Sequence, residues 1–147
     1  MKLKMILFTT ILILLSSLQL ASAQNTILGR WKTIDDETGR EKSIVTIYKE
    51  NGKFYGRVDT LFRLPDEDPN PTCSKCPDDD PRKDKLIKGM IVIKDMVQDG
   101  DEWVDGTILD PKKGKIYDCK LWLEDGKLKV RGYLFFLYRT QTWFHVK

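Results

Sequence analysis

The chain has 147 residues, of which 41% are hydrophobic and 32% are charged, and its formal net charge is +3. This length predicts one domain that can bury a core of its own. The small net charge argues against a nucleic-acid partner, because nucleic-acid binding needs a basic surface dense enough to neutralise several phosphates.

The first 23 residues have the pattern of a secretory signal peptide. Lys2 and Lys4 precede an apolar run over 5–20, and an Ala-Ser-Ala cleavage site follows at 21–23. The run has about sixteen residues, fewer than the roughly 20 that span a bilayer, so we expect cleavage and no membrane span afterwards. The expected mature domain is 24–147, exported to the periplasm or the extracellular space of a bacterium. Its lack of a cysteine after the cleavage site and of an N-glycosylation acceptor fits that bacterial route.

Cleavage would also change the charge balance. Loss of Lys2 and Lys4 lowers the number of basic residues from 25 to 23, against 22 acidic residues, which leaves a net charge of about +1. The basic character of the full chain therefore belongs largely to its first residues.

The remaining sequence alternates apolar and polar residues in short segments rich in β-branched and aromatic side chains, which predicts strands. The expected strands are 28–34, 42–50, 53–63, 90–97, 102–110, 115–124, 127–137 and 140–146. Asn51-Gly52 and Asp125-Gly126 separate two pairs of these segments and favour tight type I′ hairpins. Slightly longer turns are expected at 36–39 and 111–114. No segment shows a convincing helical period.

These elements predict an all-β fold, a single antiparallel up-and-down meander of about eight strands. Such a meander removes its exposed edges by closing into a barrel. An eight-stranded barrel is just wide enough to be filled by side chains or to hold one small ligand.

Strand alternation also assigns the two faces of two late segments. The residues expected inside are Tyr117, Cys119, Leu121 and Leu123 of one segment and Leu128, Val130, Gly132 and Leu134 of the next. This parity leaves Trp122, Tyr133 and Phe135 outside. They are ordinary surface aromatics, the sign of a bulge that reverses the parity, or a patch that binds a partner.

The stretch Gly29-Arg30-Trp31 resembles the Gly-x-Trp hallmark of lipocalins and the wider calycin group, at the opening of the first strand. The resemblance implies that Trp31 plugs the barrel base and that an arginine from the last strand lies across its ring. Arg139 in "RTQTW" is the arginine that would do so, through a cation–π contact of about 0.5–2 kcal/mol.

A longer resemblance is to DUF2147, a family of exported bacterial domains of unknown function. The matching stretches are "GRWKTID", "KSIVTIYKENGKFYGRV", the Cys-x-x-Cys loop, "GTILDPKKGKIYDCKLWLEDGKLKVRGYL" and "RTQTW". The family usually has glycine where this chain has Phe135 and Tyr138, so the path of the penultimate turn is open. The resemblance implies an exported calycin-like barrel and supplies no reaction.

The loop 64–85 contains Cys73 and Cys76 and shows no strand pattern. In an oxidising compartment we expect these two cysteines to form a disulfide that acts as a local clasp. Pairing of one of them with Cys119 is the alternative. A thiol redox centre is disfavoured because no helix follows the motif to lower the thiol pKa.

No metal or cofactor is expected. Zinc would need Cys73, Cys76, Cys119 and His145, which do not form the two local ligand pairs of a structural site. Asp66-x-Asp68-x-Asn70 resembles the start of a calcium loop, but prolines occupy the later positions that need glycine and glutamate. Loose calcium binding stays an alternative to a solvated acidic run.

The sequence predicts no enzyme, because no catalytic group of residues can be assembled. The only serines after residue 23 are Ser43 and Ser74, neither lies in a nucleophile elbow, and His145 is the only histidine. Asp110 before Pro111 is typical of a turn that starts at a strand end.

Two functions are therefore in competition. The first is a binding barrel for a small apolar or amphipathic ligand, with the 64–85 loop at its mouth. Its expected ligand-binding residues are Trp31, Tyr117, Arg131, Arg139, Gln141 and Trp143. The alternative is a structural or protein-interaction module of the cell envelope, with a filled core and with Trp122, Tyr133 and Phe135 facing a protein partner.

Overall fold

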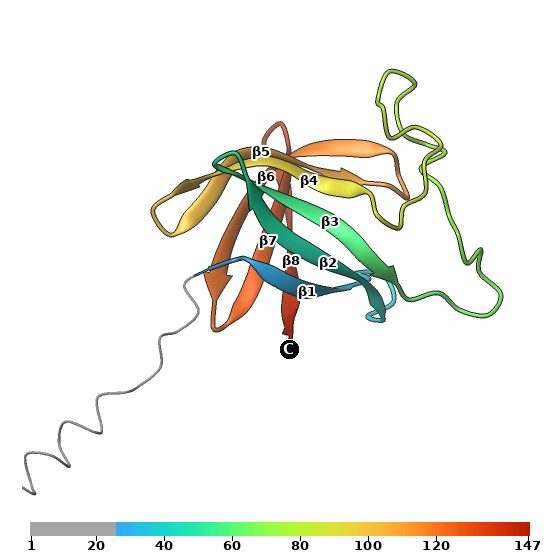
Figure 1. Ribbon diagram of the computed structural model, residues 1–147, viewed down its shortest axis with the longest axis horizontal. Helices are drawn as coiled ribbons and strands as arrows, with labels where there is room; N and C mark the ends of the chain where they lie inside the picture. The colour runs from blue at the N-terminus through green and yellow to red at the C-terminus, as the bar shows by residue number, and fades with distance from the viewer. Residues whose placement is uncertain (1–25) are drawn as a thin grey trace, which may run out of the picture.

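The computed structural model describes residues 26–147, and the predicted signal peptide lies outside them. Eight strands form one closed antiparallel barrel in which each strand pairs with its neighbours in the chain (Figure 1). Their bounds are β1 Gly29–Ile34, β2 Glu41–Glu50, β3 Lys53–Leu61, β4 Ile91–Asp99, β5 Glu102–Asp110, β6 Lys115–Glu124, β7 Lys127–Leu134 and β8 Leu137–Val146. The predicted all-β barrel is confirmed. No helix among the described residues has the length and apolar character needed to cross a bilayer.

The first and last strands close the barrel. β1 pairs with β8 through Arg30 opposite Val146, Trp31 opposite His145 and Lys32 opposite Phe144. The predicted hairpins at 51–52 and 125–126 are also confirmed, since both residues of each turn have positive φ. Neighbouring strands therefore meet with few intervening residues, and closure pairs the two outer strands of the meander, whose free edges would otherwise promote aggregation.

The end of the barrel that carries these two hairpins is filled with large apolar side chains. Trp31 is only 2% exposed, and its indole Nε1 donates a hydrogen bond to the Ile27 carbonyl at 2.8 Å. Phe54 and Trp103 pack edge to face with 5.9 Å between ring centroids. This end is the base of the barrel, and Trp31 is buried in it as expected.

The expected contact between Arg139 and Trp31 is wrong. The Trp31 ring instead packs in a T-shaped arrangement with His145, with 5.2 Å between centroids. Arg139 lies six residues before His145 on β8, which at about 3.3 Å per residue places it roughly 20 Å along the strand. Register therefore puts Arg139 at the opposite end of the barrel, where its Nη2 pairs with Asp36 Oδ2 at 2.7 Å.

The turn between β7 and β8 lies three residues earlier than the sequence predicts, at 135–136 instead of 138–139. The expected strand over 127–137 ends at Leu134, and only Phe135 and Phe136 separate it from Leu137. Phe135 has a φ of 56°, and this left-handed conformation lets the chain reverse within two residues. The two strands therefore form a continuous hairpin up to its tip.

The loop between β3 and β4 is fastened to the open end of the barrel. Cys73 and Cys76 form the predicted disulfide, both are buried, and the Cys73 Sγ lies 3.5 Å from the Pro111 carbonyl oxygen. Cys119 is free and buried in the core. The alternatives of a bond to Cys119 and of zinc ligation are wrong, because the two loop sulfurs are bonded to each other.

Gly114, in the β5–β6 turn, is packed closely against this loop, so a substitution there probes the contact between the turn and the loop. It has a φ of 66°, and an added Cβ would collide with the Lys75 carbonyl of the loop. Gly126 has a similar φ of 71° with open space around it. We expect Gly126→Ala to cost about 1 kcal/mol through backbone strain. Gly114→Ala should cost about 2–4 kcal/mol, because strain is added to the collision.

Urea unfolding of the two variants measures this difference, and limited proteolysis of 64–85 reports where it arises. Equal losses of stability in the two variants, with equal cleavage of the loop, would show that the loop is not packed against the turn.

Candidate functional site

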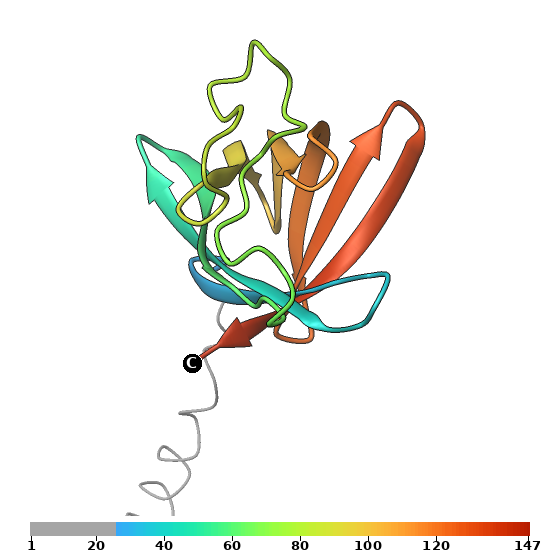
Figure 2. The same cartoon turned by 90° about the vertical axis from the view of Figure 1, so that its right-hand side faces the viewer.

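The open end of the barrel contains a cavity of about 370 Å³. Figure 2 looks toward this end, past the β3–β4 loop. Apolar side chains from the strands form its inner wall; these include Val45, Val58, Val92, Leu109 and Val130. Since the base below is filled, the barrel is a shallow cup rather than a through-going channel.

Tyr117 and Gly132 shape one side of the cup from neighbouring strands. Both line the cavity, and a Cβ added at Gly132 would lie 3.3 Å from the Tyr117 Cβ. The absence of a side chain at Gly132 thus gives the Tyr117 side chain the space that it occupies. Tyr117 lies on the inner face, as strand alternation predicted.

A chain of polar contacts runs down one wall of the cup. Arg139 and the Gln141 Nε2 both contact Asp36 Oδ2, at 2.7 and 2.6 Å. The Gln141 Oε1 in turn accepts a hydrogen bond from the Trp143 indole at 3.1 Å. Asp36 belongs to the β1–β2 turn, so these contacts fix that turn against the start of β8.

Charged side chains of both signs lie on the rim of the cup. Asp110 lines the cavity, and its Oδ1 accepts hydrogen bonds from the backbone N–H groups of Lys112 and Lys113. Lys42 and Lys113 both line the cavity, and neither forms an ion pair within the described part of the chain. Deeper in the wall, the Thr33 and Ser43 hydroxyls form a hydrogen bond with each other at 2.7 Å, so neither needs another partner. The cavity is therefore apolar inside and carries available cationic groups only at its entrance.

Four of the six predicted ligand-binding residues line this cavity, namely Tyr117, Arg139, Gln141 and Trp143. Trp31 lies outside its lining, buried in the base. Arg131 is also outside, because its parity directs it to the outer face. Its guanidinium there lies 4.9 Å from the Trp122 ring centroid and 4.3 Å from that of Tyr138.

Sequence reasoning missed Asp36, Lys42 and Lys113. The signal that could have found them is their position beside the turns at 36–39 and 111–114, which close the same end of the barrel. A meander places alternate turns together at one end, so the polar residues of these turns meet around the mouth.

Metal-ligating side chains and the free thiol are two possible kinds of reactive group among the described residues. Within residues 26–147, no three side chains of the types that ligate metals lie close enough to share an ion. Burial raises the pKa of the Cys119 thiol to about 12, so this sulfur stays protonated and is a poor nucleophile.

A partly buried ion pair holds the β3–β4 loop at the mouth. The Arg82 guanidinium donates to both Asp80 carboxylate oxygens, at 2.9 and 2.6 Å, and to the Ile91 carbonyl at 3.1 Å. The hydrogen bond from the Arg82 side chain lowers the pKa of Asp80 to about 2. The loop is thereby tied to the first residue of β4.

The chain is similar to one protein family in sequence and to one solved structure in fold. A family described as "Uncharacterized protein conserved in bacteria (DUF2147)" matches residues 29–145. Protein HP1028 from Helicobacter pylori, described as belonging to the lipocalin family, has a solved structure that superposes with a TM-score of 0.70 at 17% identity. The match covers 83% of this chain and 84% of that one, and it shows the fold alone. No curated protein matches the sequence significantly.

The Asp80–Arg82 pair predicts a specific dependence of stability on pH. The native pKa of Asp80 is below its ordinary value of 3.8, so its ionised form favours the folded state. We expect Asp80→Asn to be less stable than the wild type near neutral pH. The difference should shrink as the pH falls from about 4 to about 2, where the carboxylate becomes protonated in both states.

Urea unfolding at a series of pH values measures this effect. Asp79→Asn is the matched control, since Asp79 is exposed and carries the same charge one residue away. A stability difference for Asp80→Asn that stays constant down to pH 2, or one equal to that of Asp79→Asn, would contradict the assignment.

Proposed function

The chain belongs to the DUF2147 family of bacterial proteins, and we propose that it is an exported carrier that holds one small apolar or amphipathic ligand in the cell envelope. The observation that carries this proposal is the apolar cavity of about 370 Å³ at the open end of the barrel. Its volume falls at the lower end of the roughly 300–1,000 Å³ typical of small-molecule sites.

The distribution of charge supports an amphipathic ligand with an anionic head. An apolar tail would displace water from the valine and leucine side chains of the inner wall, which offer that water no hydrogen bonds. An anionic group would then lie at the rim near Lys42 and Lys113, where its charge stays hydrated and meets cations without partners among the described residues.

Export is supported by two independent features. The first 23 residues have the signal-peptide pattern, and the barrel carries a disulfide, a bond that persists mainly in oxidising compartments. We therefore propose the periplasm or the extracellular space as the site of function.

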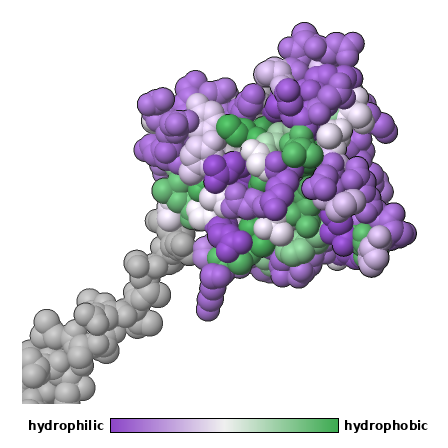
Figure 3. All heavy atoms as spheres, turned by 45° about the vertical axis from the view of Figure 1, so that its right-hand side comes forward, coloured by the Kyte–Doolittle hydropathy of each residue, from purple (hydrophilic) through white to green (hydrophobic). Residues whose placement is uncertain are grey.

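The alternative function, a protein-interaction module, is favoured by a different observation. Figure 3 shows apolar residues gathered in patches between polar regions on one face, and several large apolar residues of the described chain are exposed. A module of this kind would not need the cavity, so a test of cavity binding separates the two functions.

Filling the cup should block ligand uptake. Val130 lines the cavity and Val97 lies on the outer surface of β4, so the same change to phenylalanine can be compared inside and outside the cup. We expect Val130→Phe to weaken binding of the amphipathic anion 1-anilinonaphthalene-8-sulfonate by about tenfold or more. Val97→Phe should leave the affinity unchanged.

Fluorescence titration gives the affinity and stoichiometry, and thermal unfolding checks that each variant is folded. Native mass spectrometry of the wild type purified from its envelope should show a discrete non-covalent adduct. Unsaturable dye binding, or equal affinity in wild type and Val130→Phe, would reject the cavity as the binding site.

The rim lysines should matter only for a charged ligand. We expect Lys42→Gln/Lys113→Gln to weaken the anionic dye by roughly threefold to tenfold, the scale of exposed ion pairs, and to leave the uncharged N-phenyl-1-naphthylamine unaffected. Lys53→Gln, at the base of the barrel, is the control. Equal weakening of both dyes would show that the lysines act through packing and not through charge.

A further inference from the structure

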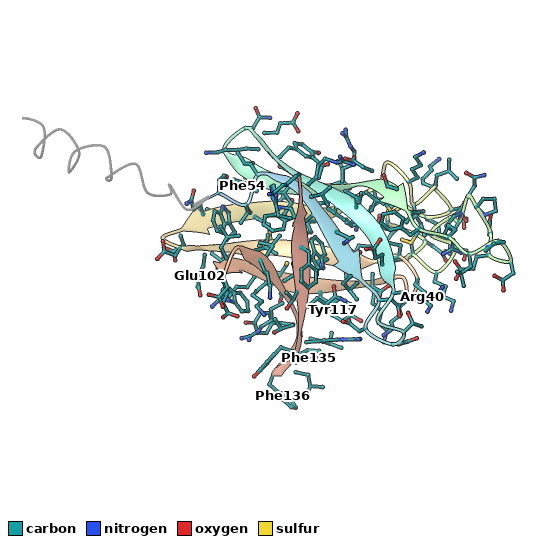
Figure 4. All side chains as sticks on the ribbon, turned by 90° about the horizontal axis from the view of Figure 1, so that it is seen from below. Arg40, Phe54, Glu102, Tyr117, Phe135 and Phe136 are labelled. Atoms are coloured by element: carbon teal, nitrogen blue, oxygen red, sulfur yellow. A yellow bond between two sulfur atoms is a disulfide. The ribbon has the colours of Figure 1, made fainter. Side chains whose placement is uncertain are left out.

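The tip of the β7–β8 hairpin is the most exposed apolar feature of the described chain. Phe135 is 91% and Phe136 is 87% exposed, and Leu134, Leu137 and Tyr138 beside them are also exposed. Figure 4 shows both phenylalanine side chains projecting away from the barrel at the end of the hairpin. Two consecutive phenylalanines are therefore almost wholly in water, and the three residues beside them are partly exposed.

The backbone conformation of Phe135 is also unusual for a phenylalanine. Phe135 occupies the left-handed region with a φ of 56°, which glycine adopts freely and large L side chains rarely do. Neither folding of the hairpin nor the core requires a phenylalanine here, since its side chain lies almost wholly in water. A strained, exposed aromatic side chain at a turn points to a role outside the folded barrel.

With increasing distance from the tip, the side chains of the hairpin change from hydrocarbon to tyrosine and then to arginine. Leu134 pairs with Leu137, then Tyr133 pairs with Tyr138, and then Gly132 pairs with Arg139 and Arg131 with Thr140. At about 3.3 Å per residue, the tyrosines lie roughly 7 Å and the arginines roughly 10–14 Å behind Phe136. The order from the tip is therefore hydrocarbon, tyrosine and cation.

We propose that this tip inserts into the surface of a phospholipid bilayer that contains anionic lipids. The order of its residues matches the depth profile of such a surface, in which acyl chains lie innermost, tyrosine prefers the interface and cations meet the headgroup phosphates. The length of the apolar part also fits the roughly 5–10 Å to which interfacial elements penetrate.

The charges around the tip favour this occupant. Arg131 forms no ion pair within the described residues and is held by the Trp122 and Tyr138 rings at the level of the headgroups. Lys115, at the start of the neighbouring strand, is also exposed near this end of the barrel, and its long side chain can extend from there to the headgroups. Arg139 is partly neutralised by Asp36, so Arg131 and Lys115 supply most of the attraction.

The shape of the tip also distinguishes a bilayer from a protein. A protein partner would need a pocket matched to a narrow convex hairpin, whereas a fluid bilayer closes around any apolar protrusion. The acidic β3–β4 loop lies on a different side of the mouth from the hairpin (Figure 2). The barrel can therefore meet an anionic surface with the hairpin while that loop stays away from it.

Docking through this tip would also place the cup beside the membrane, because Leu134, Leu137 and Tyr138 belong to the cavity lining as well. Exchange of ligand between bilayer and cup rests on the proposed function. Docking of the tip to a bilayer does not rest on the proposed function, and vesicle binding can be measured without any ligand.

Flotation with lipid vesicles tests the proposal on the mature chain. We expect the wild type to float with vesicles of phosphatidylethanolamine and phosphatidylglycerol, and less with phosphatidylcholine alone. Phe135→Gly/Phe136→Ser should lower vesicle partitioning by about tenfold or more, since it removes the two largest apolar groups of the tip. Glycine suits the backbone at 135, so this variant should fold.

Val97→Ser is the control, because it removes an exposed apolar side chain of β4, away from the tip; it should float like the wild type. Phe136→Trp adds a fifth tryptophan as a reporter. Its emission, taken as the difference between the variant and the wild type, should shift to the blue on anionic vesicles and be quenched by brominated acyl chains.

The proposal is overturned if the wild type does not float with anionic vesicles, if the tip variant floats equally well, or if the emission of the Phe136→Trp reporter stays that of an indole in water. Loss of an envelope protein partner in the tip variant, without any flotation of the wild type, would assign the tip to protein binding and likewise overturn it. Dye titration of the tip variant keeps the two proposals apart. A variant that binds 1-anilinonaphthalene-8-sulfonate normally but no longer floats has lost docking alone.

Discussion

The cup depends on the short pairing between β1 and β8. Three residue pairs join these strands, whereas seven join β6 to β7 and seven join β7 to β8. Without this seam the sheet would be open, with two edges exposed to other chains. Trp31 lies within the seam and is also buried in the base, so one residue links closure of the sheet to packing of the core.

The barrel interior has a filled base and an unfilled upper part. Large side chains such as Phe54, Trp103 and Leu121 fill the base, which leaves the upper half to smaller valines that enclose a cavity. A completely filled barrel would be more stable, because each unfilled volume forfeits dispersion contacts. The base and the seam therefore provide the stability that permits an unfilled mouth, and the buried disulfide and the Asp80–Arg82 pair hold the loop beside it.

Strand alternation and turn residues predicted the meander, the two tight hairpins and the inner position of Tyr117, because these features depend on neighbouring residues. The supposed contact of Arg139 with Trp31 failed because it depends on register across the seam, which no local pattern encodes. Arg131 was assigned to the cavity against its own parity. Asp36 reaches the site from a turn, and only the folded barrel brings that turn to β8. Strand alternation shows which side chains point inwards but not how much of the interior they fill, so it could not predict the cavity.

The exposed tip has a consequence for the protein in water. Phe135 and Phe136 remain accessible in every molecule, so two barrels that meet tip to tip bury both pairs at once. Concentrated protein without detergent or lipid should then self-associate through a contact that has nothing to do with its assembly in the cell. A solution that contains a mild surfactant would keep the barrels apart.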